Sequence, residues 1–233
     1  MRRLCLLLLG FTGSVLAFCL LLCNAFLTPS AEAESTSLMP IKLPYRIPGT
    51  QLVVKQLASY DGPFLEDGSD REVTDVAALV LFNQGPSGIK ESRVELSWTE
   101  GKYCFEAFMI PAGESVLVLE KNEQKFMLNS WTQCSGYQRL LYGDWSSFDK
   151  VTVMETTMGL LMLENTSRVC LNDICVTYKS YLAPPGVYVG GISYSVVVPK
   201  LMPGESVTIP AWHYAGGNSR IVYIGCQTGK DSH

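Results

Sequence analysis

Few residues of this chain have the types and the spacing that enzymes use for catalysis. Its 233 residues include two histidines, His213 and His233, and the G-x-S-x-G, H-E-x-x-H and phosphate-binding glycine motifs are absent. His213 with Ser206 or Ser219 and an aspartate would form a triad, but the sequence around His213 is typical of a turn. We therefore expect no catalytic residues, no cofactor and no enzyme activity, with a hydrolase of unfamiliar type as the alternative.

Five carboxylates lie close together in a turn-rich segment and suggest a calcium site, because Ca²⁺ prefers hard oxygen ligands. They are Asp61, Glu66, Asp67, Asp70 and Asp75. Their spacing does not follow the EF-hand loop, and carboxylates also gather in solvated turns. Calcium binding therefore stands beside the simpler interpretation of a solvated loop. Zinc has less support, since no C-x-x-C pair with a neighbouring histidine occurs.

A glycine-rich aromatic segment, Pro210–Ser219, offers the clearest candidate binding residues. It contains Trp212, His213 and Tyr214, and Tyr188 lies on the longer connection that precedes it. Aromatic side chains exposed on loops over a rigid scaffold stack on sugars or contact proteins. In small β-sandwiches such side chains also fill the core, so core packing is the alternative for these residues.

The cysteine count suggests disulfide bonds outside the cytoplasm. Of the eight cysteines, five follow the N-terminal apolar run: Cys104, Cys134, Cys170, Cys175 and Cys226. An odd number leaves at least one thiol unpaired within the chain. We predict that Cys104 pairs with Cys134, and that Cys226 pairs with Cys175 or with Cys170.

The uncharged run Leu4–Leu27 indicates a membrane segment. As a helix it would be long enough to cross a hydrocarbon core of about 30 Å, and Arg2 and Arg3 before it favour a cytoplasmic N-terminus. Ala31-Glu32-Ala33 also matches a signal-peptide cleavage site. Residues 1–33 are thus a signal anchor or a signal peptide. The chain is either a single-pass membrane protein with an extracytoplasmic C-terminal portion or a secreted protein cleaved near Ala33.

Charge argues against nucleic acid as a partner. The formal net charge is −4, and Arg2, Arg3 and Glu32 contribute +1 of it, so the remainder after residue 33 carries −5. That remainder has no run of lysine or arginine, whereas a phosphate backbone requires a clustered basic patch. We expect a protein or polysaccharide partner outside the cytoplasm, in addition to the membrane.

Short β-strands joined by turns are predicted for most of the chain. Residues 34–48 contain Pro40, Pro44 and Pro48 and are expected to form an extended linker. Alternation of apolar and polar residues in Arg93–Trp98 is typical of a half-buried strand. The expected strands of the first half are Gln51–Leu57, Val73–Phe82, Arg93–Trp98, Lys102–Phe108 and Val116–Leu119. The segment Lys121–Trp145 is expected to be irregular, and helix content is expected to be low.

The second half repeats the pattern of the first. Asn165-Thr-Ser corresponds to Asn83-Gln-Gly, Asp173–Tyr178 corresponds to Arg93–Trp98, and Met202–Val207 corresponds to Ile110–Val116. The shared order of turn, alternating strand, proline-glycine turn and apolar strand indicates an internal duplication. The chain is therefore expected to be mainly β, with two tandem β-sandwich domains at 49–146 and 147–233 after the membrane helix.

These motifs resemble the immunoglobulin-like β-sandwich modules found in bacterial surface and exported proteins, over roughly Gln51–Leu119 and Val151–Gly225. The Cys…Trp…Cys core of antibody-type domains is absent in recognisable form. The resemblance implies a β-sandwich fold and a role in spacing, packing or adhesion outside the cell. The expected function is a non-catalytic, membrane-anchored, envelope-associated binding module. A structural spacer or accessory subunit of a membrane assembly is the alternative.

Overall fold

The computed structural model describes residues 41–127, 131–141, 147–157, 159–183 and 186–228. These residues belong to one compact unit, Met39–His233. The predicted membrane run Leu4–Leu27 and the cleavage site at Ala33 lie outside the described residues. Within the described ranges, no helix has the length and apolar character needed to span a membrane.

The described residues form a mainly β fold, which confirms the expected fold class at that level. The strands are β1 (Tyr45–Arg46), β2 (Leu52–Pro63), β3 (Glu72–Asn83), β4 (Ile89–Trp98), β5 (Gly101–Ile110), β6 (Ser115–Leu119), β7 (Gln133–Leu140), β8 (Val151–Thr157), β9 (Leu160–Asn165), β10 (Leu171–Leu182), β11 (Val187–Leu201), β12 (Ser206–Pro210) and β13 (Ser219–Thr228). Among the described residues, the only helix is the short 3-10 helix η1 (Gly216–Asn218).

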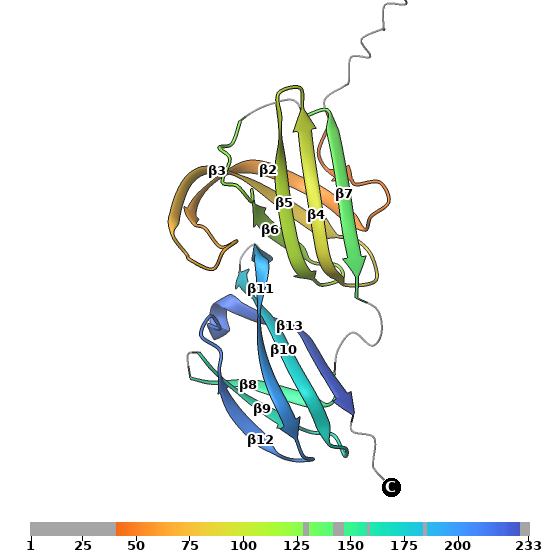
Figure 1. The fold of residues 1–233 in the computed structure, drawn as a ribbon, viewed down its shortest axis with the longest axis vertical. Coiled ribbons are helices and arrows are strands. Elements are labelled where there is room, and N and C mark those ends of the chain that lie inside the picture. Colours follow the sequence, from red (N-terminus) through yellow and green to blue (C-terminus); the bar gives the residue numbers. More distant parts are fainter. Residues whose placement is uncertain (1–40, 128–130, 142–146, 158, 184–185, 229–233) are drawn as a thin grey trace, which may run out of the picture. The chain divides into compact units, whose positions relative to one another are not determined.

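Three sheets organise these strands (Figure 1). The largest has seven strands in the order β1-β2-β3-β6-β11-β10-β13, and the others are β5-β4-β7 and β12-β9-β8. The seven-stranded sheet passes from the first half of the chain to the second through a parallel pair, β6 with β11, where Tyr188 pairs with Val116 and Val189 with Leu117. The other strand pairs are antiparallel. One sheet therefore runs through both halves.

Each half has its own hydrophobic core between two sheet layers. In the first half, Val94 and Leu96 of β4 are fully buried against the large sheet. In the second half, Ile174 and Val176 of β10 have the same role against β12-β9-β8. The alternation that predicted these strands places alternate side chains on the core face, where burial removes their apolar surface from water. Two cores along one shared sheet are the result.

Two segments differ from the sequence-based expectation. The end of the predicted linker 34–48 joins the fold, because β1 pairs with β2 and Ile47 is fully buried in the first core. The predicted irregular segment Lys121–Trp145 contains the regular strand β7. The core-facing side of β7 is made by Cys134, Gly136, Gln138 and Leu140, of which only Leu140 is a large apolar residue, so its sequence carries little of the hydrophobic pattern of a strand.

Two buried asparagines, Asn83 and Asn165, hold corresponding turns of the two halves. Asn83 Nδ2 donates to the carbonyl of Ile110 at 3.3 Å, and Asn165 Nδ2 donates to the carbonyl of Leu201 at 3.0 Å. Each amide also donates to the carbonyl four residues ahead, at 2.9 Å in both halves. Each side-chain oxygen accepts from the N–H two residues ahead. The two turns thus share one set of hydrogen bonds.

We expect Asn83→Ala and Asn165→Ala each to lower the melting temperature by several degrees. Each change leaves buried carbonyl groups without donors, at a cost of about 1–3 kcal/mol, and each kcal/mol corresponds to about 2–4 °C in a chain of this size. Calorimetry of the two single variants measures the effect. Asn122→Ala, at an exposed asparagine, is the control and should melt as the wild type does. Wild-type melting of both core variants would contradict the assigned role.

Candidate functional site

Lys179 of β10 is fully buried at the junction of the two halves. Its Nζ donates to the carbonyl of Phe108 on β5 at 3.0 Å. It also donates to the carbonyls of Gly190 and Gly191 on β11, both at 3.1 Å, and to that of Ile192 at 2.5 Å. A neutral amine has only two hydrogens to donate, so this set of acceptors favours the ammonium form. The side chain therefore connects β5 of the first half to two strands of the second.

Glu66 reaches the same junction from the connection between β2 and β3. Its Oε1 accepts from Leu119 N at 2.7 Å, and its Oε2 accepts from Gly191 N at 2.5 Å. Burial raises the pKa of Glu66 to about 7, while Lys179 acts in the opposite direction. Burial also lowers the pKa of Lys179 to about 7, and Glu66 opposes that change. The carboxylate and the ammonium thus each reduce the cost of burying the other.

Gly191 is required at this junction by space. A Cβ on residue 191 would lie 2.0 Å from the carbonyl oxygen of Glu106 and 2.5 Å from Glu66 Oε2. No side chain fits there without moving the backbone of β5. The absence of a side chain on Gly191 lets the two halves approach closely enough for the hydrogen bonds of Lys179 and Glu66.

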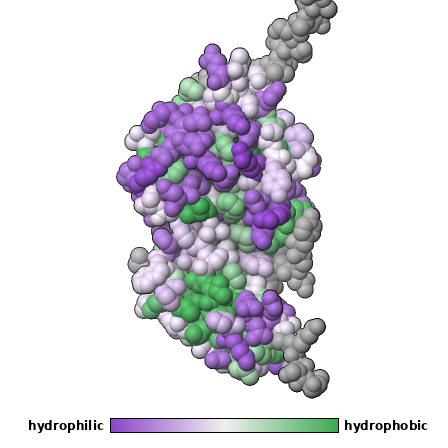
Figure 2. All heavy atoms as spheres, viewed as in Figure 1, coloured by the Kyte–Doolittle hydropathy of each residue, from purple (hydrophilic) through white to green (hydrophobic). Residues whose placement is uncertain are grey.

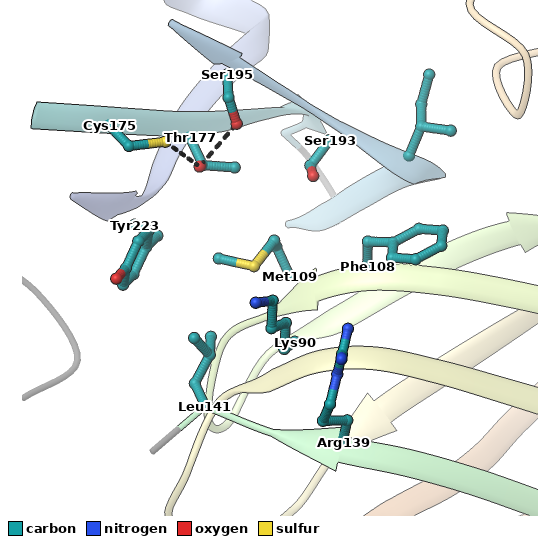
Figure 3. Close-up of a pocket in the computed structure, with 11 residues that line it drawn as sticks. Lys90, Phe108, Met109, Arg139, Leu141, Cys175, Thr177, Ser193, Ser195 and Tyr223 are labelled. Carbon is teal, nitrogen blue, oxygen red and sulfur yellow. Dashed lines mark hydrogen bonds between the residues drawn. The ribbon is translucent and has the colours of Figure 1, made fainter. Parts of the chain in front are cut away.

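A pocket of about 520 Å³ opens beside this junction, and we call it the junction pocket (Figure 3). From the first half it is lined by Lys90, Phe108, Met109, Arg139 and Leu141. From the second half it is lined by Cys175, Thr177, Ile192, Ser193, Ser195 and Tyr223. Figure 3 shows the two cationic side chains on one side and the thiol and hydroxyl groups on the other. Its volume lies within the usual range for small-molecule sites, about 300–1,000 Å³.

Irregular backbone shapes both walls of the junction pocket. The pairing of β4 with β7 shifts register between Ile89 and Glu91, so Lys90 is an extra residue in a β-bulge. Met109 on the adjacent β5 has a φ of 53°, in the left-handed region that non-glycine residues rarely adopt. In the second half, the pairing of β10 with β13 shifts register after Thr177. Bulges re-aim side chains, and here they direct lining residues into the pocket.

Three of the four predicted aromatic binding residues lie together in one loop, and the fourth, Tyr188, does not. Trp212 is 85% exposed, and the His213 ring stacks on Tyr194 with centroids 4.2 Å apart. Tyr178 lies between Tyr194, at 5.7 Å, and Tyr214, at 5.4 Å. Three ring contacts thus hold His213 and Tyr214 against Tyr194 and Tyr178, and Trp212 next to them in sequence is exposed. We call the segment Trp212–Tyr214 the aromatic loop.

Tyr188, predicted as a fourth member, lies elsewhere. It is buried in the first core, its ring meets Tyr181 edge-on at 5.2 Å, and burial raises its pKa to about 12. For the triad alternative, no hydrogen bond joins the His213 ring to Ser206 or Ser219 among the described residues. Ser219 Oγ donates to the backbone carbonyl of His213 at 3.5 Å, and the His213 ring is stacked on Tyr194.

The five carboxylates proposed for calcium do not converge. Among the described residues, no group of three histidine, cysteine or acidic side chains is placed to hold a metal ion. Glu66 turns inward to the junction, Asp61 accepts from Asp75 N at 2.7 Å, and Asp67 accepts from Ser69 N at 2.9 Å. Asp70 is exposed. Asp61 and Asp67 thus accept from backbone donors, Glu66 faces the junction, and calcium binding stays a prediction from the sequence.

The two predicted disulfides are absent, because all five described cysteines are free. Cys104 pairs in register with Glu95 and Cys134 with Leu96, on the two sides of β4, so their side chains lie on opposite faces of that sheet. The second pairing fails in the same way. Cys226 packs against the second core, whereas Cys175 points into the junction pocket. Cys170 Sγ lies 3.9 Å from the carbonyl of its neighbour Leu171.

Sequence reasoning missed Lys179, Glu66 and Lys90. Lys179 had a visible signal, since it directly follows the alternating apolar strand Asp173–Tyr178 and precedes the Gly190-Gly191 pair. Glu66 was noticed only as one of several loop carboxylates. Lys90 had no signal, because a bulge depends on the register of a partner strand about fifty residues later.

We expect the stability of the wild type relative to Glu66→Gln to fall as pH rises. The folded pKa of Glu66 is raised from 4.5 to about 7, so its contribution is fully present below about pH 4.5 and is lost as pH rises through about 7. Removing Glu66 also removes the charge that raises the pKa of Lys179, which lets the variant gain stability from Lys179 as pH rises and so acts in the same direction. The melting temperature of the wild type minus that of Glu66→Gln should fall by several degrees between about pH 5 and about pH 8, corresponding to about 2–3 kcal/mol.

Glu95→Gln is the matched control for this measurement. Hydrogen bonds from Lys102 and Arg93 lower the pKa of the Glu95 carboxyl, so it stays ionised across the same pH window. Its difference from the wild type should be flat between about pH 5 and about pH 8. A flat difference for Glu66→Gln as well would show that the buried carboxyl is not linked to folding.

Comparison with known proteins finds no match for this chain: no family model, no curated protein and no solved structure is significantly similar to it. The resemblance to immunoglobulin-like modules therefore continues to rest on the strand and turn pattern. The structural features that bear on function are the junction pocket, the aromatic loop and the pair formed by Lys179 and Glu66.

Proposed function

We propose that this chain is a non-catalytic binding module that is attached to a membrane and works outside the cytoplasm. Its partner is a protein or a polysaccharide, and Trp212 is the residue that contacts it. The observation that carries the proposal is the 85% exposure of the Trp212 side chain on a supported loop. Tryptophan is enriched among the residues that dominate binding energy, and its indole stacks on sugar rings and on protein side chains.

The loop is held in place by its own hydrogen bonds. Tyr214 N donates to the carbonyl of Ala211 at 2.8 Å, and Ala215 N donates to Ser219 Oγ at 3.0 Å. Gly216 N donates to Glu155 Oε1 on β8 at 3.2 Å. A loop that is already ordered loses little conformational entropy on binding, which favours recognition.

The second half also presents more apolar surface than the first. Of the twelve exposed large hydrophobic residues described, eight lie after residue 147. Figure 2 agrees: the visible face is mostly hydrophilic over the first half and has a hydrophobic area over the second. Exposed apolar area next to polar surroundings is typical of contact surfaces. This distribution supports the second half as the side that meets the partner.

The membrane location in this proposal rests on the sequence, and the common ancestry of the two halves rests on their matching turns. Leu4–Leu27 supports membrane attachment, and Ala31-Glu32-Ala33 supports secretion if the run is cleaved. The matching hydrogen bonds of Asn83 and Asn165 support two immunoglobulin-like sandwiches derived from one duplicated unit. A fold of this kind suits adhesion or spacing without specifying either.

A structural spacer or accessory subunit is the second candidate. It is favoured by the continuous seven-stranded sheet and by the buried Lys179, which together hold the two halves as a single body. A spacer needs stiffness between its ends, and a buried, hydrogen-bonded junction supplies it. In that case a membrane partner would co-purify with the chain independently of Trp212.

We expect Trp212→Ala to reduce partner binding at least about tenfold without changing the melting temperature, since truncation of an exposed hot-spot residue removes contact area only. Glycan arrays, and pull-downs after mild crosslinking in intact cells, provide the measurement. Tyr137→Ala is the matched control, because Tyr137 is a 55% exposed aromatic residue on β7 of the first half. Equal binding by both variants would contradict the proposal and favour the spacer.

A further inference from the structure

Lys90 is a cation without a partner. Among the described residues it has no hydrogen bond and no ion pair, whereas Lys102 binds Glu95, Lys121 binds Glu106 and Lys179 binds backbone carbonyls. The β-bulge at Lys90 directs its side chain into the junction pocket, as Figure 3 shows. Lys90 is exposed, so its ammonium group is available to a ligand that enters the pocket.

The second cation of the junction pocket is Arg139. One of its guanidinium nitrogens, Nη2, lies 2.7 Å from Glu91 Oε2, which leaves other N–H groups of the guanidinium available. No carboxylate is among the residues that line the pocket. The lining therefore carries net positive charge in a chain whose net charge is −4. This charge favours an anion over a neutral or cationic ligand.

Hydroxyl groups face these cations from the second half. Thr177 Oγ1 and Ser195 Oγ lie 2.9 Å apart and share one hydrogen bond. Thr177 Oγ1 also lies 3.9 Å from Cys175 Sγ. The two hydroxyls and the thiol carry three hydrogens for these two contacts, so one hydrogen stays available to a ligand oxygen. Ser193 adds a further hydroxyl to the lining. The polar groups of the pocket are thus mostly donors, which suits a ligand rich in acceptor oxygens.

The rest of the lining is apolar. Phe108 and Met109 of β5, with Leu141 and Ile192, provide a wall on which a hydrocarbon or aromatic body can pack. Met109 holds the left-handed backbone noted above. Backbone strain of this kind is concentrated at ligand sites, where it fixes the position of a side chain. An apolar wall with a few converging polar groups is the usual composition of a small-molecule site.

We propose that the junction pocket binds a small molecule made of an apolar body and one oxyanion group, a carboxylate or a phosphate ester. Lys90 and Arg139 hold the oxyanion, Thr177 donates to one of its oxygens, and the apolar body packs on Met109. The site shares no residue with the aromatic loop, so the proposal is independent of the partner contacted by Trp212.

Equilibrium dialysis tests the proposal. The full-length chain is held in nanodiscs whose lipids carry no net charge, and empty nanodiscs are the blank. The ligands are 2-naphthoate, 1-naphthyl phosphate and neutral 2-naphthalenemethanol. We expect at least one anion to bind at least about tenfold more tightly than the alcohol, because a charge-assisted hydrogen bond contributes that much. The anion that binds more tightly shows whether the pocket prefers a carboxylate or a phosphate ester. Equal binding of anions and alcohol, or no saturable binding, overturns the proposal.

Substitutions locate the bound anion. Lys90→Met keeps the apolar stem and removes the charge, and it should weaken binding at least about tenfold. Lys200→Met, at an exposed lysine of β11, is the control and should bind as the wild type does. Ser195→Trp fills the pocket and should abolish binding. Unchanged affinity in Lys90→Met, or in Ser195→Trp with an unchanged melting temperature, overturns the assignment.

Discussion

The buried ammonium group of Lys179 is the interaction on which the arrangement of the two halves depends. It satisfies carbonyl groups of β5 and β11 together, and Glu66 satisfies N–H groups of β6 and β11 next to it. Removing one partner from such a buried network typically costs about 3–5 kcal/mol, because the remaining polar groups lose both water and protein partners. Apolar contacts also cross the junction, since Tyr188 and Val222 of the second half are buried in the first core, and the polar network adds hydrogen bonds of fixed geometry to them.

The junction pocket follows from the same constraint. Phe108 gives its carbonyl to Lys179 and its side chain to the pocket wall, so one residue of β5 belongs to both. Gly191 permits close approach of β11 to β5, and the bulge in β4 places Lys90 in the lining of the pocket beside that contact. The shape of the pocket is therefore determined by backbone geometry more than by loop sequence.

The sequence predicts the local elements well and the junction poorly. Alternation in Arg93–Trp98 identified β4, and the two asparagine turns were matched correctly, because strand periodicity and turn chemistry are local properties. The edge strand β7 was missed because Leu140 is the one large apolar residue on its core side. The disulfide pairings were not reproduced, since the sequence does not determine which face of a sheet a cysteine side chain occupies. Glu66 and Gly191 meet only through tertiary structure, and neither has a local signal.

The parallel pairing of β6 with β11 makes the two halves share one sheet. Tandem domains joined only by a flexible linker can be exchanged, deleted or repeated during evolution, because each folds without the other. Here a strand of each half completes the hydrogen bonding of the other, and both would expose an unpaired strand edge if separated. The two halves are therefore not independent modules, because the edge strand of each is covered by the other.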